Sequence, residues 1–522
     1  MKSFYYLLGA AAIALASCSE STELETNPIN NLAAKGTAVS FGTYQAQSTR
    51  AGETGSMTTA ALKKSKGFGV FAYYTEEKDW SAAGATATPN WMWNQQVKWS
   101  DSATDPSTGA TGGAWTYAPV KFWPNDNQTA DDSKATGTTS SKISFFAYAP
   151  YVGDETTGAF SPATGETGIS ALTQNGIAGN PKVTYTLAKT GKTVDLLWGT
   201  GVTKYSTVTG STIEGKLASS DALAATNIDI VKLPTGQKIK FNFKHALAKI
   251  GGSPEKANPD VPGSTDEDTK HGLQVQLDID KDGAITGGDK PDVTKVTIKT
   301  IKIENNAGAE DYNGDGKKGA EDTEGLDKIF STGTLDLATG KWDIDKNSAA
   351  AVIDHEITSP ASSEEEISAS AATIADNLAE PASVAKTAEG FDGLKAGVLT
   401  TPQNVYKEET NPLVFIPGTK PSFKVTIEYV VRTKDAHLKD GYSEATQKIS
   451  KMVSFPNVEL NKKYNLIMHL GLTSIKFTAS VENWESTDAV EVWNDLDNDG
   501  VKDEGEVTYS STQVDLPINV AD

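Results

Sequence analysis

Three aspartate-rich segments of the chain carry the residue types and the spacing of calcium-binding loops. Calcium takes about 6–8 oxygen ligands, and a twelve-residue loop supplies them at alternate positions, with glycine at the sixth position for the turn. The segments span residues 278–289, 311–322 and 495–506, and each has glycine at its sixth position. The sequence therefore predicts calcium as a cofactor, with up to three ions bound.

The three loops differ in how complete their ligand sets are. In the first loop the candidate ligands are Asp278, Asp280, Asp282, the backbone carbonyl of Ala284, Thr286 and Asp289. In the second they are Asp311, Asn313, Asp315, the backbone carbonyl of Lys317 and Asp322. In the third they are Asp495, Asp497, Asp499, the backbone carbonyl of Val501, Asp503 and Glu506. Only the third loop ends in a glutamate that can bind with both oxygens, and the alternative for all three is an ordinary surface turn of an acidic protein.

The only cysteine, Cys18, follows a segment with the features of an export signal. Lys2 precedes an apolar run from Phe4 to Leu15, which is too short to span a bilayer. The residues from Leu15 to Cys18 resemble the bacterial lipobox, in which the cysteine is acylated and becomes the new N-terminus. Residues 1–17 are therefore expected to be a lipoprotein signal peptide, and the alternative is a buried free cysteine behind an ordinary signal. A single cysteine also excludes a disulfide framework.

Arginine is rare in this chain. The 47 basic Lys and Arg residues include only two arginines, Arg50 and Arg432. Arg432 lies in an apolar run that predicts a strand, whereas Arg50 lies in a polar segment with a glycine nearby, the kind of loop that proteases cleave. One hypothesis is a bias toward lysine, and the other is a single cleavage site between Arg50 and Ala51 for an Arg-specific protease.

Patterns for catalysis are absent from the sequence. The five histidines form no HExxH motif, and the chain contains no GxSxG motif and no phosphate-binding loop. His245 lies in a predicted strand and is interpreted as a structural histidine. The net charge of −21 argues against nucleic acid as a partner. We therefore predict that the protein is not an enzyme.

Six tryptophans gather between residues 80 and 123. Exposed rings could stack on sugars, which would suit a glycan-binding surface. However, Trp91, Trp93, Val97 and Trp99 share one strand parity, which favours a sheet face turned toward the core.

Short Val, Ile, Phe and Tyr runs alternate with polar residues, the pattern of an all-β protein. They predict strands over residues 37–44, 68–74, 120–123, 143–150, 194–198, 239–245, 293–304, 411–417, 422–433, 449–455, 463–470 and 474–481. A single helix is predicted after Ser363, where Glu366 completes a capping box and Ile367, Ala371, Ile374 and Leu378 share one face. A boundary between two domains is expected near residue 235, between residues 220 and 250.

Several motifs carry a family resemblance in their order along the chain. They are Trp115-Thr116-Tyr117, Lys121-Phe122-Trp123-Pro124, residues 145–150, 241–249, 470–477 and 481–484. Together with the lipobox, they resemble the fimbrillins, which are lipoprotein pilins of type V pili, over most of residues 64–484. The resemblance implies two tandem transthyretin-like β-sandwich domains. It also implies that a protease removes an N-terminal strand and that a strand from a neighbouring subunit refills the groove.

The chain departs from shorter fimbrillins by insertions around residues 255–295, 305–325 and 345–405, so details there cannot be inherited. At its C-terminus, Val514, Leu516, Ile518 and Val520 share one face of a predicted strand. This strand could complete a sheet of its own chain, or it could be the donor strand that fills the groove of the next subunit. Pro517 has no N–H to donate, so a local interruption of the ladder is expected there.

These observations give an expected domain order. It comprises the signal peptide 1–17, a lipidated propeptide with a removable strand over 18–50, β-sandwich domains over 51–235 and 236–490, and a calcium-type loop with the donor strand over 491–522. The expected function is a stalk subunit of a cell-surface pilus, made as an outer-membrane lipoprotein. Its expected partners are copies of itself, related pilins, the processing protease and the membrane lipid. The alternatives are a tip adhesin or a calcium-dependent glycan-binding lipoprotein; an anchor subunit is less suited because anchors need no donor strand.

Overall fold

The structure is a computed structural model. It describes residues 38–44, 59–104, 111, 113–124, 141–155, 157, 159–160, 168–187, 194–201, 204–206, 212–214, 227–232, 238–250, 273–277, 293–305, 329–345, 354–358, 372–394, 403–408, 413–418, 421–455, 458–471, 475–483, 492–493, 508–509, 514–516 and 519–521.

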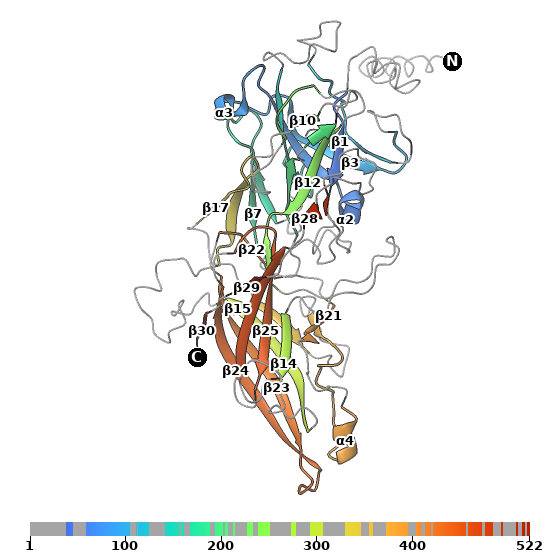
Figure 1. Cartoon of the computed structure of the whole chain (residues 1–522), viewed down its shortest axis with the longest axis vertical. Helices are drawn as coiled ribbons and strands as arrows, with labels where there is room; N and C mark the ends of the chain where they lie inside the picture. Colours follow the sequence, from blue (N-terminus) through green and yellow to red (C-terminus); the bar gives the residue numbers. More distant parts are fainter. Residues whose placement is uncertain are drawn as a thin grey trace, which may run out of the picture.

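An eight-stranded sheet organises the N-terminal half of the chain (Figure 1). Its strands are β1 (Phe41–Tyr44), β2 (Phe68–Tyr74), β3 (Met92–Ser100), β4 (Ala114–Thr116), β5 (Ile143–Ala149), β8 (Leu197–Gly201), β11 (Asn227–Ile230) and β12 (Ile239–His245). Their order is β1-β12-β8-β5-β2-β3-β4, with β11 on β5. Although β1 and β4 stand at opposite ends of this order, they contact each other, so the sheet curls until its edges meet.

A second, four-stranded sheet covers one face of the first. It contains β6 (Ile169–Leu172), β7 (Lys182–Thr186), β16 (Thr332–Asp336) and β17 (Trp342–Ile344), in the order β17-β16-β7-β6. Alternate side chains of β2 and β5, such as Phe71 and Tyr148, are buried in one core with Tyr185 and Leu335. The other alternate positions of β2 and β5 contribute Val70 and Phe145 to a separate core on the opposite face. Both faces of the large sheet are thus buried, which explains why β2 and β5 are apolar along nearly their whole length.

The predicted order of consecutive domains over 51–235 and 236–490 differs from the strand pairing. Strand β12 pairs with β1 and β8, so residues 239–245 belong to the first sheet. Strand β16 pairs with β7, so the β16–β17 hairpin returns to the N-terminal unit from far along the chain. These pairings join strands that lie far apart in the chain, so no local pattern in the sequence indicates them.

Two seven-stranded sheets form the C-terminal unit. The first contains β13 (Ala248–Ile250), β14 (Leu273–Leu277), β20 (Gln403–Asn404), β22 (Leu413–Phe415), β25 (Lys462–Leu470), β26 (Ile475–Asn483) and β29 (Val514–Leu516). The second contains β15 (Thr294–Asn305), β18 (Asp354–Thr358), β19 (Ala372–Ile374), β21 (Tyr406–Glu408), β23 (Ser422–Lys434), β24 (Tyr442–Ser454) and β30 (Asn519–Ala521). The two sheets bury a shared apolar core, as the all-β sandwich interpretation predicted.

Two small sheets of two strands each and three short helices complete the named elements among the described residues. Each of these small sheets is antiparallel, one pairing β9 (Lys204–Ser206) with β10 (Thr212–Glu214), and the other β27 (Val492–Trp493) with β28 (Thr508–Tyr509). The helices are α2 (Thr59–Lys64), α3 (Trp80–Ala83) and α4 (Ala388–Asp392). None of the described helices has the length and apolar character needed to cross a membrane.

The predicted helix after Ser363 is wrong over its second half. Residues 372–374 form β19, which pairs with β18 and β21, and Ala379 bridges to Ile298. Ile374 and Leu378 are fully buried against the sheet. Tertiary pairing therefore overrides the local helical pattern, as it often does for short segments.

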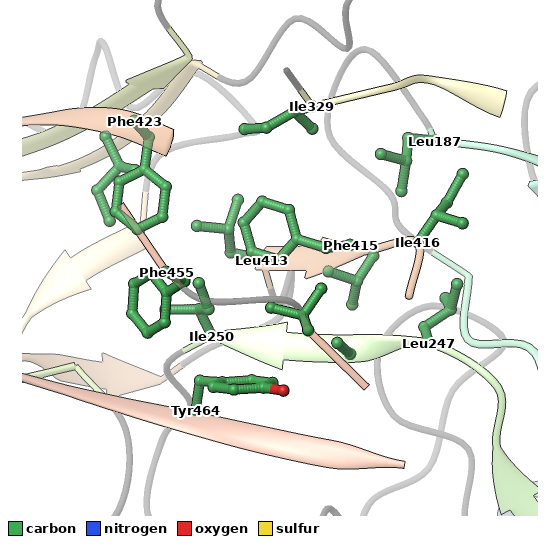
Figure 2. Packing of buried hydrophobic residues seen from close by; sticks show 14 of the residues in the cluster. Leu187, Leu247, Ile250, Ile329, Leu413, Phe415, Ile416, Phe423, Phe455 and Tyr464 are labelled. Carbon is green, nitrogen blue, oxygen red and sulfur yellow. The ribbon is translucent and has the colours of Figure 1, made fainter. Parts of the chain in front are cut away.

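An apolar cluster joins the two units. Figure 2 shows Leu187 and Ile416 near Leu247, with Phe415, Phe423 and Phe455 farther into the C-terminal unit. The rings of Phe415 and Phe423 stack with centroids 6.2 Å apart, and those of Phe423 and Phe455 are 5.7 Å apart. Across this junction, the indole N–H of Trp342 donates to the carbonyl of Ala246 at 2.9 Å. The core is therefore continuous from one unit to the other.

Candidate functional site

The N-terminal strand β1 closes the seam of the curled sheet. Its residues run parallel to β12, with Phe41 opposite Ile239. The N–H of Ile239 donates to the carbonyl of Ser40 at 2.8 Å. On the other side, the N–H of Val39 donates to the carbonyl of Lys121 at 2.9 Å, and Ala38 bridges to Phe122. The segment from Ala38 to Tyr44 therefore bonds to β12 on one side and, on the other, to Lys121 and Phe122, which follow β4 in the chain.

Tyr117 fixes the start of this segment. Its hydroxyl donates to the carbonyl of Val39 at 2.7 Å and lies 3.3 Å from the carbonyl of Lys121. It also accepts a hydrogen bond from the N–H of Lys121 at 3.2 Å. Burial raises the pKa of Tyr117 far above its ordinary value, and the hydrogen bond with Lys121 offsets this only in part. The hydroxyl therefore stays protonated, and it links the two segments by donating to Val39 and accepting from Lys121.

The side chains of the segment fill an aromatic groove. Val39 and Phe41 are 0% and 2% exposed. The ring of Phe41 stacks on that of Phe241 at 6.1 Å and meets the edges of Tyr117 at 5.3 Å and Phe145 at 6.0 Å. Burying Val39 and Phe41 contributes roughly 1.5–3 kcal/mol each. Loss of the segment would remove these contacts and expose the rings of Tyr117, Phe145 and Phe241 that pack against Phe41.

Sequence reasoning predicted this strand over residues 37–44, and the structure has β1 at Phe41–Tyr44 with an extended lead-in from Ala38. It missed the lining of the groove. Tyr117 and Phe241 stood in the motifs that carried the family resemblance, but no role was assigned to them. The available signal was their aromatic character next to strand residues, which does not indicate which strand they contact.

The tryptophans are mostly core residues, as strand parity favoured. Trp80, Trp115 and Trp123 are buried. The prediction that Trp93 and Trp99 share one face of the strand is wrong. Trp93 packs on the core between the two sheets, whereas Trp99 packs on the core that contains Phe41. The strand register shifts near Asn94, whose φ of 43° marks a bulge, and this reverses the faces.

His245 and Arg432, the two polar residues that the sequence placed in predicted strands, are buried and contact carboxylates. Asp195 Oδ2 lies 2.6 Å from His245 Nδ1, and both residues are 2% exposed. Arg432 is 3% exposed and contacts Glu380 and Glu444, each at 2.7 Å. Burial by itself lowers the pKa of Arg432, but the two carboxylates raise it overall. Arg432 is therefore inaccessible to a protease in the folded chain.

The predicted C-terminal strand is divided into two in the structure. Val514–Leu516 (β29) pairs antiparallel with β26, with Leu516 opposite Ala479. Asn519–Ala521 (β30) pairs antiparallel with β24, with Val520 opposite Val453. Pro517 and Ile518 come between the two strands in the sequence and lie outside the described residues. The C-terminal segment thus joins the edges of both sheets in its own C-terminal unit.

Several predicted site residues lie outside the part of the chain that the structure describes. These are the lipidation residue Cys18, the cleavage residues Arg50 and Ala51, and all three predicted calcium loops over residues 278–289, 311–322 and 495–506. Within the described ranges, no group of three or more His, Cys, Asp or Glu side chains could hold a metal ion. Calcium therefore stays a prediction from the sequence.

Comparison with known proteins connects the chain to fimbrial subunits. No family model matches the chain. The fimbrium subunit Fim1C of Phocaeicola vulgatus is 27% identical over 260 residues, which are 50% of this chain and 52% of that protein. The match thus spans about half the length of this curated relative.

Solved structures align over more of the chain at lower identity. A fimbrial protein from Bacteroides vulgatus covers 86% of this chain and 99% of its own, with 18% identity and a TM-score of 0.49. A candidate cell adhesion protein from Bacteroides uniformis covers 86% and 97%, with 11% identity and a TM-score of 0.31.

Proposed function

We propose that this chain, a fimbrillin by its sequence similarity to the fimbrium subunit Fim1C, is a structural stalk subunit of a cell-surface pilus. It assembles with other copies and related pilins by donor-strand exchange. The observation that carries this proposal is the position of β1, a parallel edge strand that plugs an aromatic groove and closes the sheet.

The position of Arg50 supports processing as the trigger. Only residues 45–49 separate the end of β1 at Tyr44 from Arg50. Cleavage between Arg50 and Ala51 cuts the covalent link between the segment Ala38–Tyr44, which contains β1, and the rest of the fold. This segment is then held only by non-covalent contacts. Its departure exposes a sheet edge with which a strand from another subunit can pair.

The C-terminal segment supplies the incoming strand in this proposal. Four apolar side chains at alternating positions, Val514, Leu516, Ile518 and Val520, can replace those that leave with β1. In the monomer, β29 and β30 each pair over only three residues, so few ladder bonds oppose their release. A head-to-tail contact of this kind is heterologous and propagates as an open filament.

Two variants test the mechanism by electron microscopy after Arg-specific proteolysis. Arg50→Ala is expected to give a folded, unprocessed monomer. Deletion of residues 512–522 is expected to give a processed monomer that forms no filaments. Full-length filaments from either variant would contradict donor-strand exchange.

Lipid attachment at Cys18 is the membrane part of the proposal. The precursor is held in the outer membrane by this acyl anchor until cleavage releases the subunit. Cys18→Ser is expected to abolish acyl labelling and surface delivery, with the Arg50→Ala chain as a labelled control. Normal acyl labelling of Cys18→Ser would exclude the lipobox interpretation.

A further inference from the structure

The outer edge of β24 is paired over only a small part of its length. β24 pairs with β23 through all thirteen of its residues, from Tyr442 to Ser454. On its other edge, β30 covers only Met452–Ser454. In the described portion of the chain, no named strand pairs with the edge from Tyr442 to Ser450 (Figure 1). Such an edge is a template for another strand.

Two backbone hydrogen bonds at the ends of the β23–β24 pair identify which groups of β24 point to this edge. At one end, the N–H of Asp435 donates to the carbonyl of Gly441 at 3.0 Å. At the other end, the N–H of Phe455 donates to the carbonyl of Pro421 at 2.9 Å. Since bonding alternates along an antiparallel pair, the odd-numbered residues of β24 bond to β23. The even-numbered residues, from Tyr442 to Ser450, therefore direct their N–H and C=O groups outward.

The side chains on these even positions carry a self-complementary charge pattern. Glu444, Thr446, Lys448 and Ser450 are all exposed. They lie on the outer face of the sheet, where Glu444 contacts Arg432 and Lys448 lies 3.8 Å from Glu428. An acidic and a basic residue thus flank Thr446 symmetrically.

We infer that this edge pairs antiparallel with the same edge of a second copy, about a twofold axis at Thr446. An even residue must face an even residue for the outward groups to bond. An axis at Glu444 or Lys448 would place like charges directly opposite each other, which is unfavourable. An axis at Thr446 places Glu444 of each copy opposite Lys448 of the other, so both charge pairs are favourable.

The resulting contact joins the outer sheets of two C-terminal units into one continuous sheet. Every even residue from Tyr442 to Ser450 exchanges two backbone hydrogen bonds with its opposite residue. A contact between two edge strands is small, which is typical of weak and reversible association. This pairing is independent of the proposed pilus assembly, because it uses neither the groove of β1 nor the C-terminal strand.

Disulfide trapping tests the register directly. The background is the full chain with Cys18→Ser and Arg50→Ala, which removes the native thiol and keeps cleavage-dependent assembly off. Adding Thr446→Cys is expected to give a disulfide dimer under mild oxidation, because residues in a bonded antiparallel pair have Cα atoms about 5.5 Å apart. Adding Ser450→Cys instead gives an equally exposed thiol on the same strand face, far from its counterpart, and is expected to stay monomeric. Equal crosslinking of the two variants, or none in either, would overturn the inference.

Sedimentation velocity over a concentration series tests the charge pattern. Lys448→Glu places two carboxylates opposite each other at both symmetric positions and is expected to weaken the dimer roughly tenfold or more. Lys439→Glu makes the same change in net charge within the exposed turn before β24 and is expected to leave the association unchanged. Equal weakening by both substitutions, or by neither, would exclude this interface.

Discussion

Two tyrosines on neighbouring strands bury their hydroxyls in one core but differ in hydrogen bonding. Tyr148 donates to Asn94 Oδ1 at 2.7 Å and also contacts the backbone of Val152. The Tyr73 hydroxyl is buried with no hydrogen-bond partner in the described structure. Burial raises the pKa of both phenols. An unpaired buried hydroxyl costs stability, whereas a paired one contributes to it.

Tyr73→Phe is therefore expected to raise the free energy of unfolding by about 1 kcal/mol. Tyr148→Phe, the matched control, is expected to lower it by about 1–3 kcal/mol because it removes the donor that Asn94 accepts from. Urea unfolding followed by circular dichroism measures both changes. A loss of stability in Tyr73→Phe as large as that in Tyr148→Phe would contradict this account.

Alkaline pH is expected to destabilise the fold through its buried phenols. Burial raises the pKa of Tyr429 and of Tyr464 to about 12. Unfolded tyrosine ionises near pH 10, so the stabilising effect of these neutral phenols is complete below about pH 10 and is lost as pH rises toward about 12. Thermal melts over this pH range, with phenolate absorbance as a second probe, should show the decrease. A melting temperature that stays constant across this range would contradict it.

At the scale of elements, β1 and the curled sheet stabilise each other. The segment from Ala38 to Tyr44 supplies Val39 and Phe41 to a core whose other members lie between Leu62 and Phe243. Because β1 is a terminal strand that pairs with β12, its departure leaves the order of the remaining strands intact. The same property suits it to be replaced by another strand.

Substitution of Phe41 measures how much its ring in β1 contributes to the stability of the fold. Phe41→Ala is expected to lower the free energy of unfolding of the precursor by about 3–5 kcal/mol, because it empties the centre of an aromatic cluster. Phe41→Leu keeps most of the apolar volume and should cost much less. Hydrogen exchange of the β12 amides should rise more in Phe41→Ala than in Phe41→Leu. Equal protection of β12 in both variants would mean that the strand backbone, and not the ring, holds the groove closed.

At the scale of the whole molecule, the predicted third calcium loop lies in the sequence between β26 and the candidate donor strand. Residues 495–506 separate β26, which ends at Asn483, from β29, which begins at Val514. A metal ion bound there would reduce the conformational freedom of the connection and lower the ordering cost of docking the strand.

Asp497→Ala combined with Asp499→Ala is expected to lower the melting temperature in calcium but not in chelator. The matched control is Asp278→Ala in the first loop, which should leave the calcium dependence from the third loop in place. Identical melting of the unsubstituted chain with and without calcium would remove this proposal.

The sequence by itself determined the class of the fold and most of its strands. An apolar run predicted β2 and an alternating pattern predicted β12, both with the bounds found in the structure. Similar runs predicted strands at β5, β15, β23 and β25. The single cysteine, Cys18, suggested export as a lipoprotein, and the rarity of arginine suggested processing at Arg50. Both hypotheses rest on residue type and local sequence. These features are local, so they can be interpreted without knowing what each segment contacts.

Only the tertiary structure decided which strands share a sheet and what β1 covers. The sequence does not indicate that β16 returns to β7 or that β1 lies between β12 and Lys121. The sequence pattern also predicted a helix where β19 forms. It predicted a single sheet face for Trp93 and Trp99, which the bulge at Asn94 places on opposite faces. Pairing partners in a sheet are far apart in the chain, and alternation specifies a buried face without specifying the strand that buries it.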